Sequence, residues 1–183
     1  VRFKSEDRNE IESAYQNKIK SLVIDASGNE VSGVHATDIV LKEEMAKKPE
    51  ERRLPLYIYT SDDQKQYYII PMYGMGLWGP IWGYISLESD FNTVYGSLFD
   101  HKGETPGLGA EINTDAFQKQ FEGKKMYDNS NNFVSVRVVK KGQGAEFASE
   151  NKVDGISGGT ITSNGTDKML NDWILQYLTY FKK

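Results

Sequence analysis

Alternating hydrophobic and polar positions predict a sheet in the middle of the chain. Residues 54–60 and 66–71 are rich in β-branched and aromatic side chains, and the polar residues 61–63 separate them. Two such segments joined by a short polar turn predict a β-hairpin. The same pattern continues over residues 81–87 and 93–99, so we expect the sheet to extend through both segments.

Apolar residues recur at helical spacing near both ends of the chain. Near the C-terminus, Thr166 and Asp167 are typical helix-start residues. The apolar stripe that follows them consists of Leu170, Trp173, Ile174, Tyr177, Leu178 and Phe181. We expect this amphipathic helix to pack on the sheet. The N-terminal region, residues 1–23, predicts a mostly polar helix from Glu6 to Val23, with periodic positions at Ile11, Tyr15, Ile19 and Leu22.

Shorter elements complete the expected fold. Residues 35–51 predict a short surface helix or an insertion, and residues 114–121 predict a short helix with Asn113 or Thr114 as its N-cap. Residues 134–139 alternate as a strand does. Because strands are grouped around a few helices, the pattern is typical of an α+β fold: a twisted, mostly antiparallel sheet with flanking helices.

Composition narrows the classes of function. A chain of 183 residues with 38% hydrophobic content fits a single domain over residues 1–183. A net charge of -4, without a long basic run, gives no reason to expect nucleic-acid binding. The absence of cysteine excludes disulfides and thiolate clusters. His35 and His101 are not spaced as a metal-binding pair, and no run reaches the roughly 20 apolar residues of a membrane helix.

Paired glycines followed by hydroxyl groups predict a phosphate-binding loop. The stretch Asp-Gly-Ile-Ser-Gly-Gly-Thr-Ile-Thr-Ser begins at Asp154, and Gly158 and Gly159 precede the hydroxyls of Thr160 and Thr162. Glycines let backbone N–H groups approach an anion, and the positive end of the following helix favours negative charge. An ordinary Gly/Ser/Thr surface turn remains an alternative interpretation.

Two further glycine-rich segments occur earlier in the chain. The first is Gly-Met-Gly-Leu-Trp-Gly-Pro-Ile-Trp-Gly over residues 74–83, and the second is Gly-Glu-Thr-Pro-Gly-Leu-Gly-Ala-Glu over residues 103–111. Both segments combine glycines with larger apolar residues. Such segments suit a wide, flat and partly apolar ligand, which needs an apolar face, polar tips at the ring edge and little bulk elsewhere.

In the same order, the three segments resemble those of the FMN-binding domain family, in particular the NqrC family of Na+-translocating NADH:quinone reductases. The attachment motif of that family is Asp-x-x-Ser/Thr-Gly-Ala-Thr, and its members carry FMN as a phosphoester on the final Thr, which is Thr160 here. Gly159 stands where the motif has Ala. The resemblance covers roughly residues 54–173, and three ordered matches are more specific than a lone glycine motif.

The resemblance implies roles for individual residues. It implies a covalent FMN on Thr160, attached by a separate flavin transferase, with no catalytic residue and no metal in this chain. Trp78 and Leu108 would contact the isoalloxazine ring, while Glu104 and Thr105 would shape the polar edge and the ribityl region. The remaining candidates for the cofactor site are Gly76, Leu77, Gly107, Asp154, Ser157, Gly158, Gly159 and Thr162.

Among these, Asp154 would belong to the sequence that the transferase recognises, and Ser157 would hydrogen-bond the phosphate or the loop backbone. Plainer interpretations stay open for three of the others. Trp78 could be a core tryptophan below a glycine turn, Leu108 could serve simple packing, and Glu104 could be a solvated loop carboxylate.

The resemblance also implies an electron carrier that relays single electrons between neighbouring subunits of a membrane reductase. It implies the bacterial cytoplasmic membrane as location, with one N-terminal membrane helix and the FMN domain on the outer face. Because the chain begins with Val1 and not Met, we expect that helix to have been removed.

Two alternatives remain. One is the component of the ion-pumping ferredoxin:NAD+ (Rnf) complex that shares the attachment motif, but whose glycine segment lacks the pair Leu77-Trp78. The other is a non-redox binding domain that kept the fold and lost the flavin, which Gly159 permits.

Overall fold

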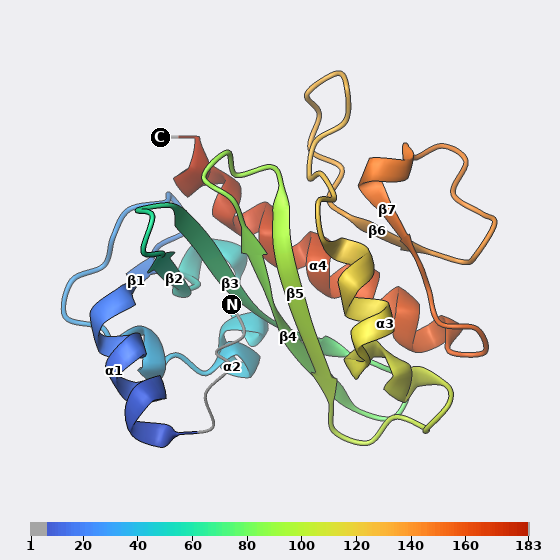
Figure 1. The fold of residues 1–183 in the computed structure, drawn as a ribbon, viewed down its shortest axis with the longest axis horizontal. Coiled ribbons are helices and arrows are strands. Elements are labelled where there is room, and N and C mark those ends of the chain that lie inside the picture. Colours follow the sequence, from blue (N-terminus) through green and yellow to red (C-terminus); the bar gives the residue numbers. More distant parts are fainter. Residues whose placement is uncertain (1–6, 183) are drawn as a thin grey trace.

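A five-stranded antiparallel sheet forms the centre of the molecule. The structure is a computed structural model, and it describes residues 7–182. The strands lie side by side in sequence order (Figure 1), and they are β1 (Ile19–Ile24), β2 (Leu54–Thr60), β3 (Gln66–Met75), β4 (Pro80–Leu87) and β5 (Val94–His101). The predicted hairpin and the two strands that follow it are therefore confirmed.

Side chains alternate between the two faces of the sheet. In β2, Leu54, Leu56 and Ile58 are buried, whereas Tyr57 between them is only partly buried. Partial burial raises the pKa of Tyr57 to about 12. Register pairs Tyr57 with Ile69 of β3, so residues on one face of one strand meet residues on the same face of the next.

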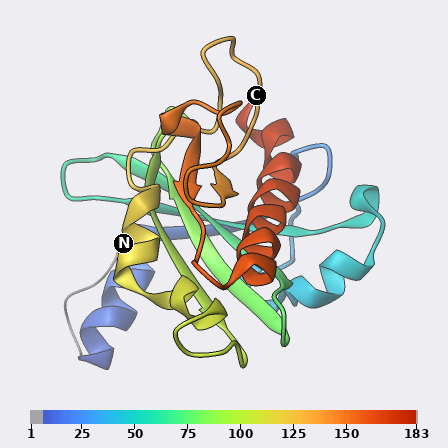
Figure 2. The same ribbon diagram turned by 90° about the vertical axis from the view of Figure 1, so that its right-hand side faces the viewer.

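The C-terminal helix α4 (Thr160–Phe181) covers one face of the sheet, as Figures 1 and 2 show. Its predicted stripe is buried there except for Phe181, which is partly buried, and two of its side chains also bond to strands. The Trp173 indole N–H donates to the carbonyl of Tyr73 at 2.6 Å, and the Tyr177 hydroxyl donates to the carbonyl of Pro55 at 2.7 Å. The predicted α+β fold, with its C-terminal helix on an antiparallel sheet, is confirmed.

Helix α4 begins earlier than its sequence signals indicate. Thr166 and Asp167 lie inside the helix, which starts at Thr160. Gly165 favours a turn in isolation, but here it lies in the helix where the backbone of another segment approaches. A Cβ atom on Gly165 would lie 2.2 Å from the carbonyl oxygen of Met75. Tertiary contact therefore overrides the local glycine signal.

The N-terminal helix is shorter than predicted. Helix α1 runs from Arg8 to Lys18, and the side chain of Asp7 caps it. The next six residues, Ile19–Ile24, form β1 on the edge of the sheet. The prediction of a helix up to Val23 was wrong, because the β-branched residues at the end of this segment are buried by pairing with β2. Residues 1–6 of the predicted N-terminal helical region lie outside the described residues.

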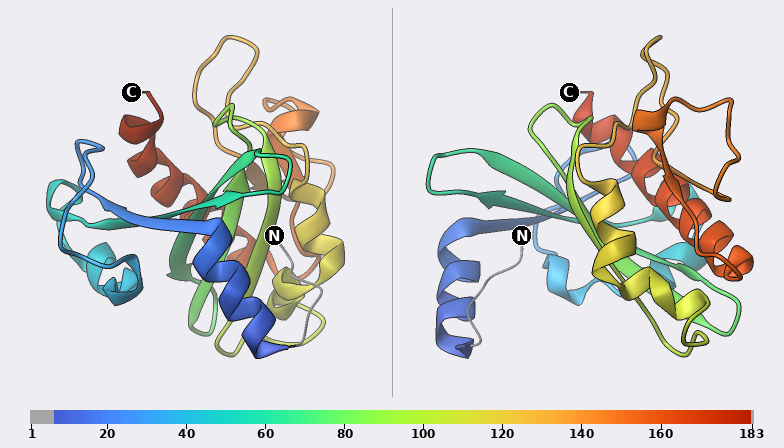
Figure 3. Two further views of the ribbon diagram at one scale, coloured as in Figure 1. Left: turned by 60° about the vertical axis from the view of Figure 1, so that its left-hand side comes forward. Right: turned by 45° about the vertical axis from the view of Figure 1, so that its right-hand side comes forward.

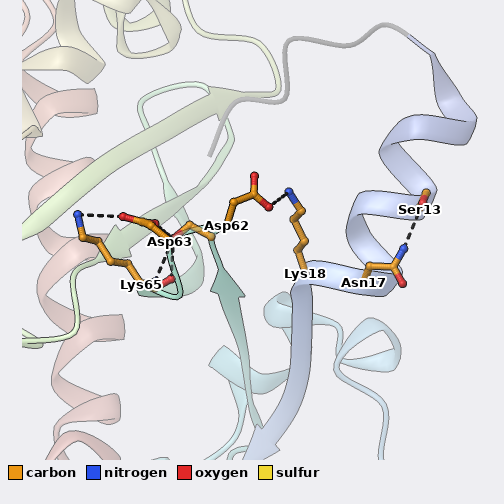
Figure 4. Close-up of polar contacts among 7 residues, drawn as sticks. Ser13, Asn17, Lys18, Asp62, Asp63 and Lys65 are labelled. Atoms are coloured by element: carbon orange, nitrogen blue, oxygen red, sulfur yellow. Dashed lines mark hydrogen bonds and ion pairs between the residues drawn. The ribbon is translucent and has the colours of Figure 1, made fainter.

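An exposed ion pair ties α1 to the β2–β3 turn. The Lys18 ammonium lies 2.8 Å from a carboxylate oxygen of Asp62 (Figure 4). The amide of the preceding residue, Asn17, donates to the Ser13 hydroxyl one turn earlier at 3.2 Å. Exposed pairs of this kind contribute little to stability, and α1 otherwise projects away from the sheet (Figure 3).

The remaining elements are short. Helices α2 (Leu41–Ala46) and α3 (Asp115–Gln118) confirm the two short helices predicted, and Thr114 caps α3 by accepting a backbone N–H. A separate parallel pair joins β6 (Arg137–Val139) to β7 (Lys152–Asp154). Short 3-10 helices lie at Ala36–Asp38, Pro49–Glu51, Gly109–Asn113, Lys119–Phe121 and Ser149–Asn151.

Strand β6 is shorter than the predicted strand over residues 134–139. Ser135 has a φ of 62°, which is a left-handed conformation and incompatible with a continuous strand. The alternation of the sequence was therefore a correct signal for only the second half of the segment.

Within residues 7–182, no helix is both long enough and apolar enough to cross a membrane. In the same part of the chain, His, Asp and Glu side chains form no group of three that could hold a metal ion.

Candidate functional site

A single carboxylate joins the three segments that the sequence singled out. One oxygen of Glu104 accepts the backbone N–H of Trp78 at 2.8 Å, and the other accepts the hydroxyl of Thr162 at 2.5 Å. Glu104 is 4% exposed and Thr162 is 1% exposed. The β3–β4 turn, the loop after β5 and the start of α4 therefore meet at one end of the molecule (Figures 1 and 2).

Two glycines make room for this carboxylate. A Cβ atom on Gly76 would lie 2.6 Å from one oxygen of Glu104. A Cβ atom on Gly109 would lie 2.4 Å from the other oxygen and 2.4 Å from the hydroxyl of Thr162. Both separations are far below van der Waals contact, so neither position accepts a side chain without displacing the hydrogen-bonded pair.

The hydrogen bonds keep Glu104 ionised inside the protein. Burial alone would raise the pKa of its carboxyl, but the Thr162 hydroxyl and the backbone N–H groups of Trp78 and Leu77 lower the pKa below its usual value. Donors that favour the charged form outweigh desolvation here. An ionised carboxylate can only accept, so the hydroxyl proton of Thr162 points at Glu104. The prediction that Glu104 could be a solvated loop carboxylate is wrong.

The loop before α4 packs closely on the segment that follows Glu104. Gly158 has a φ of 75°, and a Cβ there would lie 2.6 Å from a methyl carbon of Leu108. A Cβ on Gly159 would lie 3.2 Å from the backbone nitrogen of Gly109 and 3.0 Å from a methyl carbon of Ile156. Small residues are thus required at position 158, and position 159 is confined on two sides.

Thr160 is the first residue of α4, and its side chain is exposed. The N-cap residue Gly159 has no side chain, so it offers no oxygen to the first backbone N–H groups of the helix. Ser163 instead bonds backward, because its hydroxyl accepts the backbone N–H of Ile156 at 2.9 Å. This bond fixes the loop, and the N-cap residue places no side chain at the positive end of the helix.

Large apolar side chains are exposed around this end of the molecule. Trp78 is 68% exposed, which excludes the interpretation of Trp78 as a core tryptophan. The other exposed apolar residues of the three segments are Met75, Leu77, Leu108 and Ile161. Exposed apolar side chains that gather on one surface mark binding sites in soluble proteins.

The structure also places the remaining predicted residues. Thr105 is exposed, and its carbonyl accepts the N–H groups of Leu108 at 3.1 Å and Ala110 at 3.2 Å, which closes the loop. Gly107 has a φ of 74°, and its N–H donates to the Glu111 carboxylate at 3.0 Å. These contacts form the turn that presents Leu108.

Asp154, the last residue of β7, and Ser157, on the loop between β7 and α4, are both exposed. The backbone of Asp154 is held at both ends by the Gln120 side chain, whose oxygen accepts the N–H at 2.9 Å and whose amide donates to the carbonyl at 3.2 Å. Gln120 and Ser163 position the loop and were missed at the sequence level. Nothing in a single sequence distinguishes them from other polar residues of their helices.

Comparisons with known proteins identify the family of the chain. A family model described as FMN-binding domain matches residues 76–175. The crystal structure of the Na(+)-translocating NADH-quinone reductase C subunit from Parabacteroides distasonis is 40% identical, with a TM-score of 0.85 over 97% of this chain and 85% of that chain. NqrC from Shewanella oneidensis is 27% identical, with a TM-score of 0.80 over 96% and 88%.

Among curated relatives, the Na(+)-translocating NADH-quinone reductase C subunit of Vibrio anguillarum is 40% identical over 119 residues, which cover 65% of this chain and 46% of the relative. The corresponding protein of Haemophilus ducreyi is 44% identical over 105 residues, which cover 57% and 39%. This chain therefore spans less than half the length of these relatives. By its site, its fold and these matches, the chain belongs to the FMN-binding domain family and, within it, to the NqrC family of Na+-translocating NADH-quinone reductases.

Proposed function

We propose that this chain carries FMN as a phosphoester on the side-chain oxygen of Thr160. The observation that supports this most is the contrast between the two threonines at the start of α4. Thr160 is exposed at the uncapped end of the helix, whereas Thr162 is buried and donates its hydroxyl proton to Glu104. Only Thr160 offers an accessible hydroxyl together with helix N–H groups that favour a phosphate.

The residues around Thr160 fit the parts of FMN. Gly158 and Gly159 add no side chain near the phosphate position, and Ser157 is exposed beside them. The exposed side chains of Trp78 and Leu108 supply apolar surface for the flat ring system. Because an ester removes dissociation, the flavin needs only a shallow and open site.

Attachment requires an activated donor and a separate transferase. The Thr160 oxygen forms a new bond to the phosphorus of FMN while the donor's phosphoanhydride P–O bond breaks. The remainder of the donor leaves with that oxygen, and the hydroxyl proton of Thr160 passes to a base of the transferase. Thr160 is therefore a modification acceptor and not a catalytic nucleophile, and Asp154 belongs to the segment that the transferase recognises.

The bound FMN supplies one-electron and two-electron redox chemistry, while the protein supplies position and electrostatic environment. We propose that the domain relays electrons between neighbouring subunits of a Na+-translocating NADH-quinone reductase. The names of the relatives support this role over that of a component of the ferredoxin:NAD+ complex. By the same family argument, we propose an N-terminal membrane helix in the full-length protein and an outer-face location for this domain.

Coexpression with the flavin transferase tests the attachment. We expect the wild-type chain to gain the mass of one FMN ester and a yellow colour that persists after denaturation. Thr160→Ala should gain neither, while Thr179→Ala, an exposed threonine at the other end of α4, should be modified like the wild type. A wild-type chain that stays colourless and unshifted in mass would instead support a non-redox binding domain. FMN on the Thr160→Ala variant would move the ester to Thr162.

A further inference from the structure

Glu104 connects groups that are far apart in the sequence. Its partners Trp78 and Thr162 come from the β3–β4 turn and from α4, and Thr162 lies 58 positions after Glu104. Its backbone N–H also donates to a ring nitrogen of His101 at 3.1 Å, which fixes the start of its own loop. Both carboxylate oxygens are therefore occupied inside the protein, and Glu104 has no side-chain oxygen directed at a ligand on the surface.

Holding Thr162 inward determines where Thr160 points. Consecutive residues of an α-helix are separated by about 100° around the axis, so two positions correspond to about 200°. With the Thr162 hydroxyl fixed against Glu104, the side chain of Thr160 is directed to the opposite side, which is solvent. A rotation of the first turn of α4 would carry Thr160 away from this orientation and break the bond to Glu104.

The other oxygen of Glu104 controls the position of the exposed apolar residues. It accepts the backbone N–H of Trp78 at 2.8 Å, and the neighbouring N–H of Leu77 also stabilises the carboxylate. Leu77 and Trp78 are the exposed residues of the β3–β4 turn. The Glu104 carboxylate thus fixes the start of α4, which carries Thr160, relative to the β3–β4 turn, which carries Trp78.

We infer that Glu104 is a positioning residue, which acts through Thr162 and the backbone of Trp78 to hold the anchored flavin ring against Trp78 and Leu108. This inference rests on the proposed attachment of FMN to Thr160. It assigns Glu104 an indirect role, in place of the direct contact with the flavin edge that the sequence resemblance implies. The hydroxyl of Thr162 takes part in the same positioning, because it is the group through which Glu104 holds the start of α4.

Two substitutions at Thr162 separate shape from hydrogen bonding. Thr162→Val keeps the shape of the side chain and removes the hydroxyl, whereas Thr162→Ser keeps the hydroxyl and removes a methyl group. Neither changes the charge. Glu104→Gln removes the carboxylate, and Glu122→Gln, at an exposed glutamate directly after the 3-10 helix Lys119–Phe121, is the matched control.

The readout is the fluorescence and anisotropy of the covalent FMN in chains whose mass shows complete attachment and whose thermal unfolding shows a folded protein. A ring held against Trp78 is quenched and rigid. We expect Thr162→Val and Glu104→Gln each to raise FMN emission at least twofold and to lower its anisotropy, while Thr162→Ser and Glu122→Gln match the wild type. The double variant of Glu104→Gln and Thr162→Val should be no worse than the stronger single variant, because both substitutions act on the same hydrogen bond between residues 104 and 162.

Unchanged emission and anisotropy in folded Thr162→Val and Glu104→Gln would overturn the inference while leaving the attachment to Thr160 intact. If Glu104→Gln does not fold, the Thr162→Val and Thr162→Ser pair decides alone, since equal emission in both excludes the role of the hydroxyl. Absence of FMN from the wild-type chain is a different outcome, because it removes the proposed function and the inference with it.

Discussion

At the residue scale, the site depends on glycines that leave space for polar contacts. The paired oxygens of Glu104 and Thr162 occupy the volume that a methyl group on Gly109 would need. Side-chain ends usually move aside at little cost, but these atoms are held by hydrogen bonds to the Trp78 backbone and to each other. Displacing them leaves buried polar groups unpaired, which is expensive.

Gly109→Ala should therefore destabilise the protein by about 1–3 kcal/mol, because the added methyl group overpacks the site. Gly103→Ala is the matched control: no heavy atom lies within 4 Å of its added Cβ, so its effect should stay within about 0.5 kcal/mol. Denaturant unfolding of both variants measures the difference. Equal stability of the two variants would show that the side chains of Glu104 and Thr162 can move away from the added methyl group at little cost.

The pKa of Glu104 makes its contribution depend on pH. The folded-state pKa lies below the ordinary value of 4.5, so the ionised form stabilises the fold above that value. This stability is lost as the pH falls through the lower, folded-state pKa. We expect Glu104→Gln to be less stable than the wild type at pH 7 and the gap to shrink toward pH 3. A gap in the free energy of unfolding that is constant over this range would contradict the assignment.

At the element scale, α4 and the β3–β4 turn approach each other so closely that backbone meets backbone. Gly165 lies next to the carbonyl of Met75 within the first turns of the helix. Helix propensity favours Ala over Gly by about 1 kcal/mol, whereas a methyl group 2.2 Å from a carbonyl oxygen must push two elements apart. The clash should dominate, since a backbone atom cannot move aside alone.

Gly165→Ala should consequently lower the free energy of unfolding by about 2 kcal/mol or more, against the propensity scale. Its neighbour Asn164 is exposed on the same helix, and Asn164→Ala should instead gain up to about 0.5 kcal/mol. Thermal and denaturant unfolding of the two variants give the sign of each effect. A stabilised Gly165→Ala variant would mean that α4 can shift away from the turn.

A partly buried ion pair fastens β6 to α4. The two oxygens of Asp167 accept two guanidinium N–H groups of Arg137 at 2.9 and 2.7 Å, and one of them also accepts the backbone N–H of Val138 at 2.8 Å. One residue further on, Lys168 pairs with Asp172 on the same helix, but this lysine is mostly exposed. Two ion pairs with similar chemistry thus differ in how many groups they satisfy.

Asp167→Ala should cost about 2 kcal/mol, because three donors lose their acceptor. Asp172→Ala should cost no more than about 0.5 kcal/mol, as is usual for exposed pairs at this helical spacing. Unfolding in low and high salt separates the two, since screening weakens the exposed pair more. Similar losses for both variants would show that the Arg137 contact contributes nothing beyond an ordinary surface pair.

At the scale of the whole molecule, the residue proposed to carry the flavin is separate from the core. The core lies between the sheet and α4 and includes Trp173, Tyr177 and Phe99, all almost fully buried. Thr160 lies outside it on the surface. Stability therefore does not depend on the residue proposed to carry the flavin.

We predict that Thr160→Ala leaves the free energy of unfolding of the unmodified protein within about 0.5 kcal/mol of the wild type. Trp173→Phe, which loses buried ring volume and the bond to the Tyr73 carbonyl, should lose about 2 kcal/mol. Calorimetry on unmodified protein measures both. A large loss for Thr160→Ala would mean that its hydroxyl supports the fold.

The sequence predicted those parts of the molecule whose local pattern agrees with their packing. The 54–60 and 66–71 hairpin and the stripe through Trp173 are such cases, since periodicity reports burial directly. It failed where distant contacts decide: the helical Gly165 depends on Met75, and the left-handed backbone at Ser135 interrupts an alternating segment. The segment after Lys18 has a helical pattern of apolar residues, and only its pairing with β2 makes it a strand.

For the site, motif resemblance indicated which segments matter but not how they are connected. The pattern nominated Thr160, Trp78 and Leu108 as candidates, and all three are exposed, as are the neighbouring apolar residues. The contact between Glu104 and Thr162 could not be predicted, because no local rule links residues 58 positions apart. Hydrogen bonds of this range arise only from the fold.

The length of α4 sets a limit on how such a domain can pass charge. Its 22 residues extend about 33 Å from Thr160 to Phe181, and tunnelling rates fall exponentially with distance. If Thr160 carries the flavin as proposed, the flavin lies close to one end of the helix only, and we expect donor and acceptor to approach that same end in alternation. A photo-crosslinker at Ile161 should then capture either partner, with each excluding the other; simultaneous capture of both would argue against this one-port arrangement.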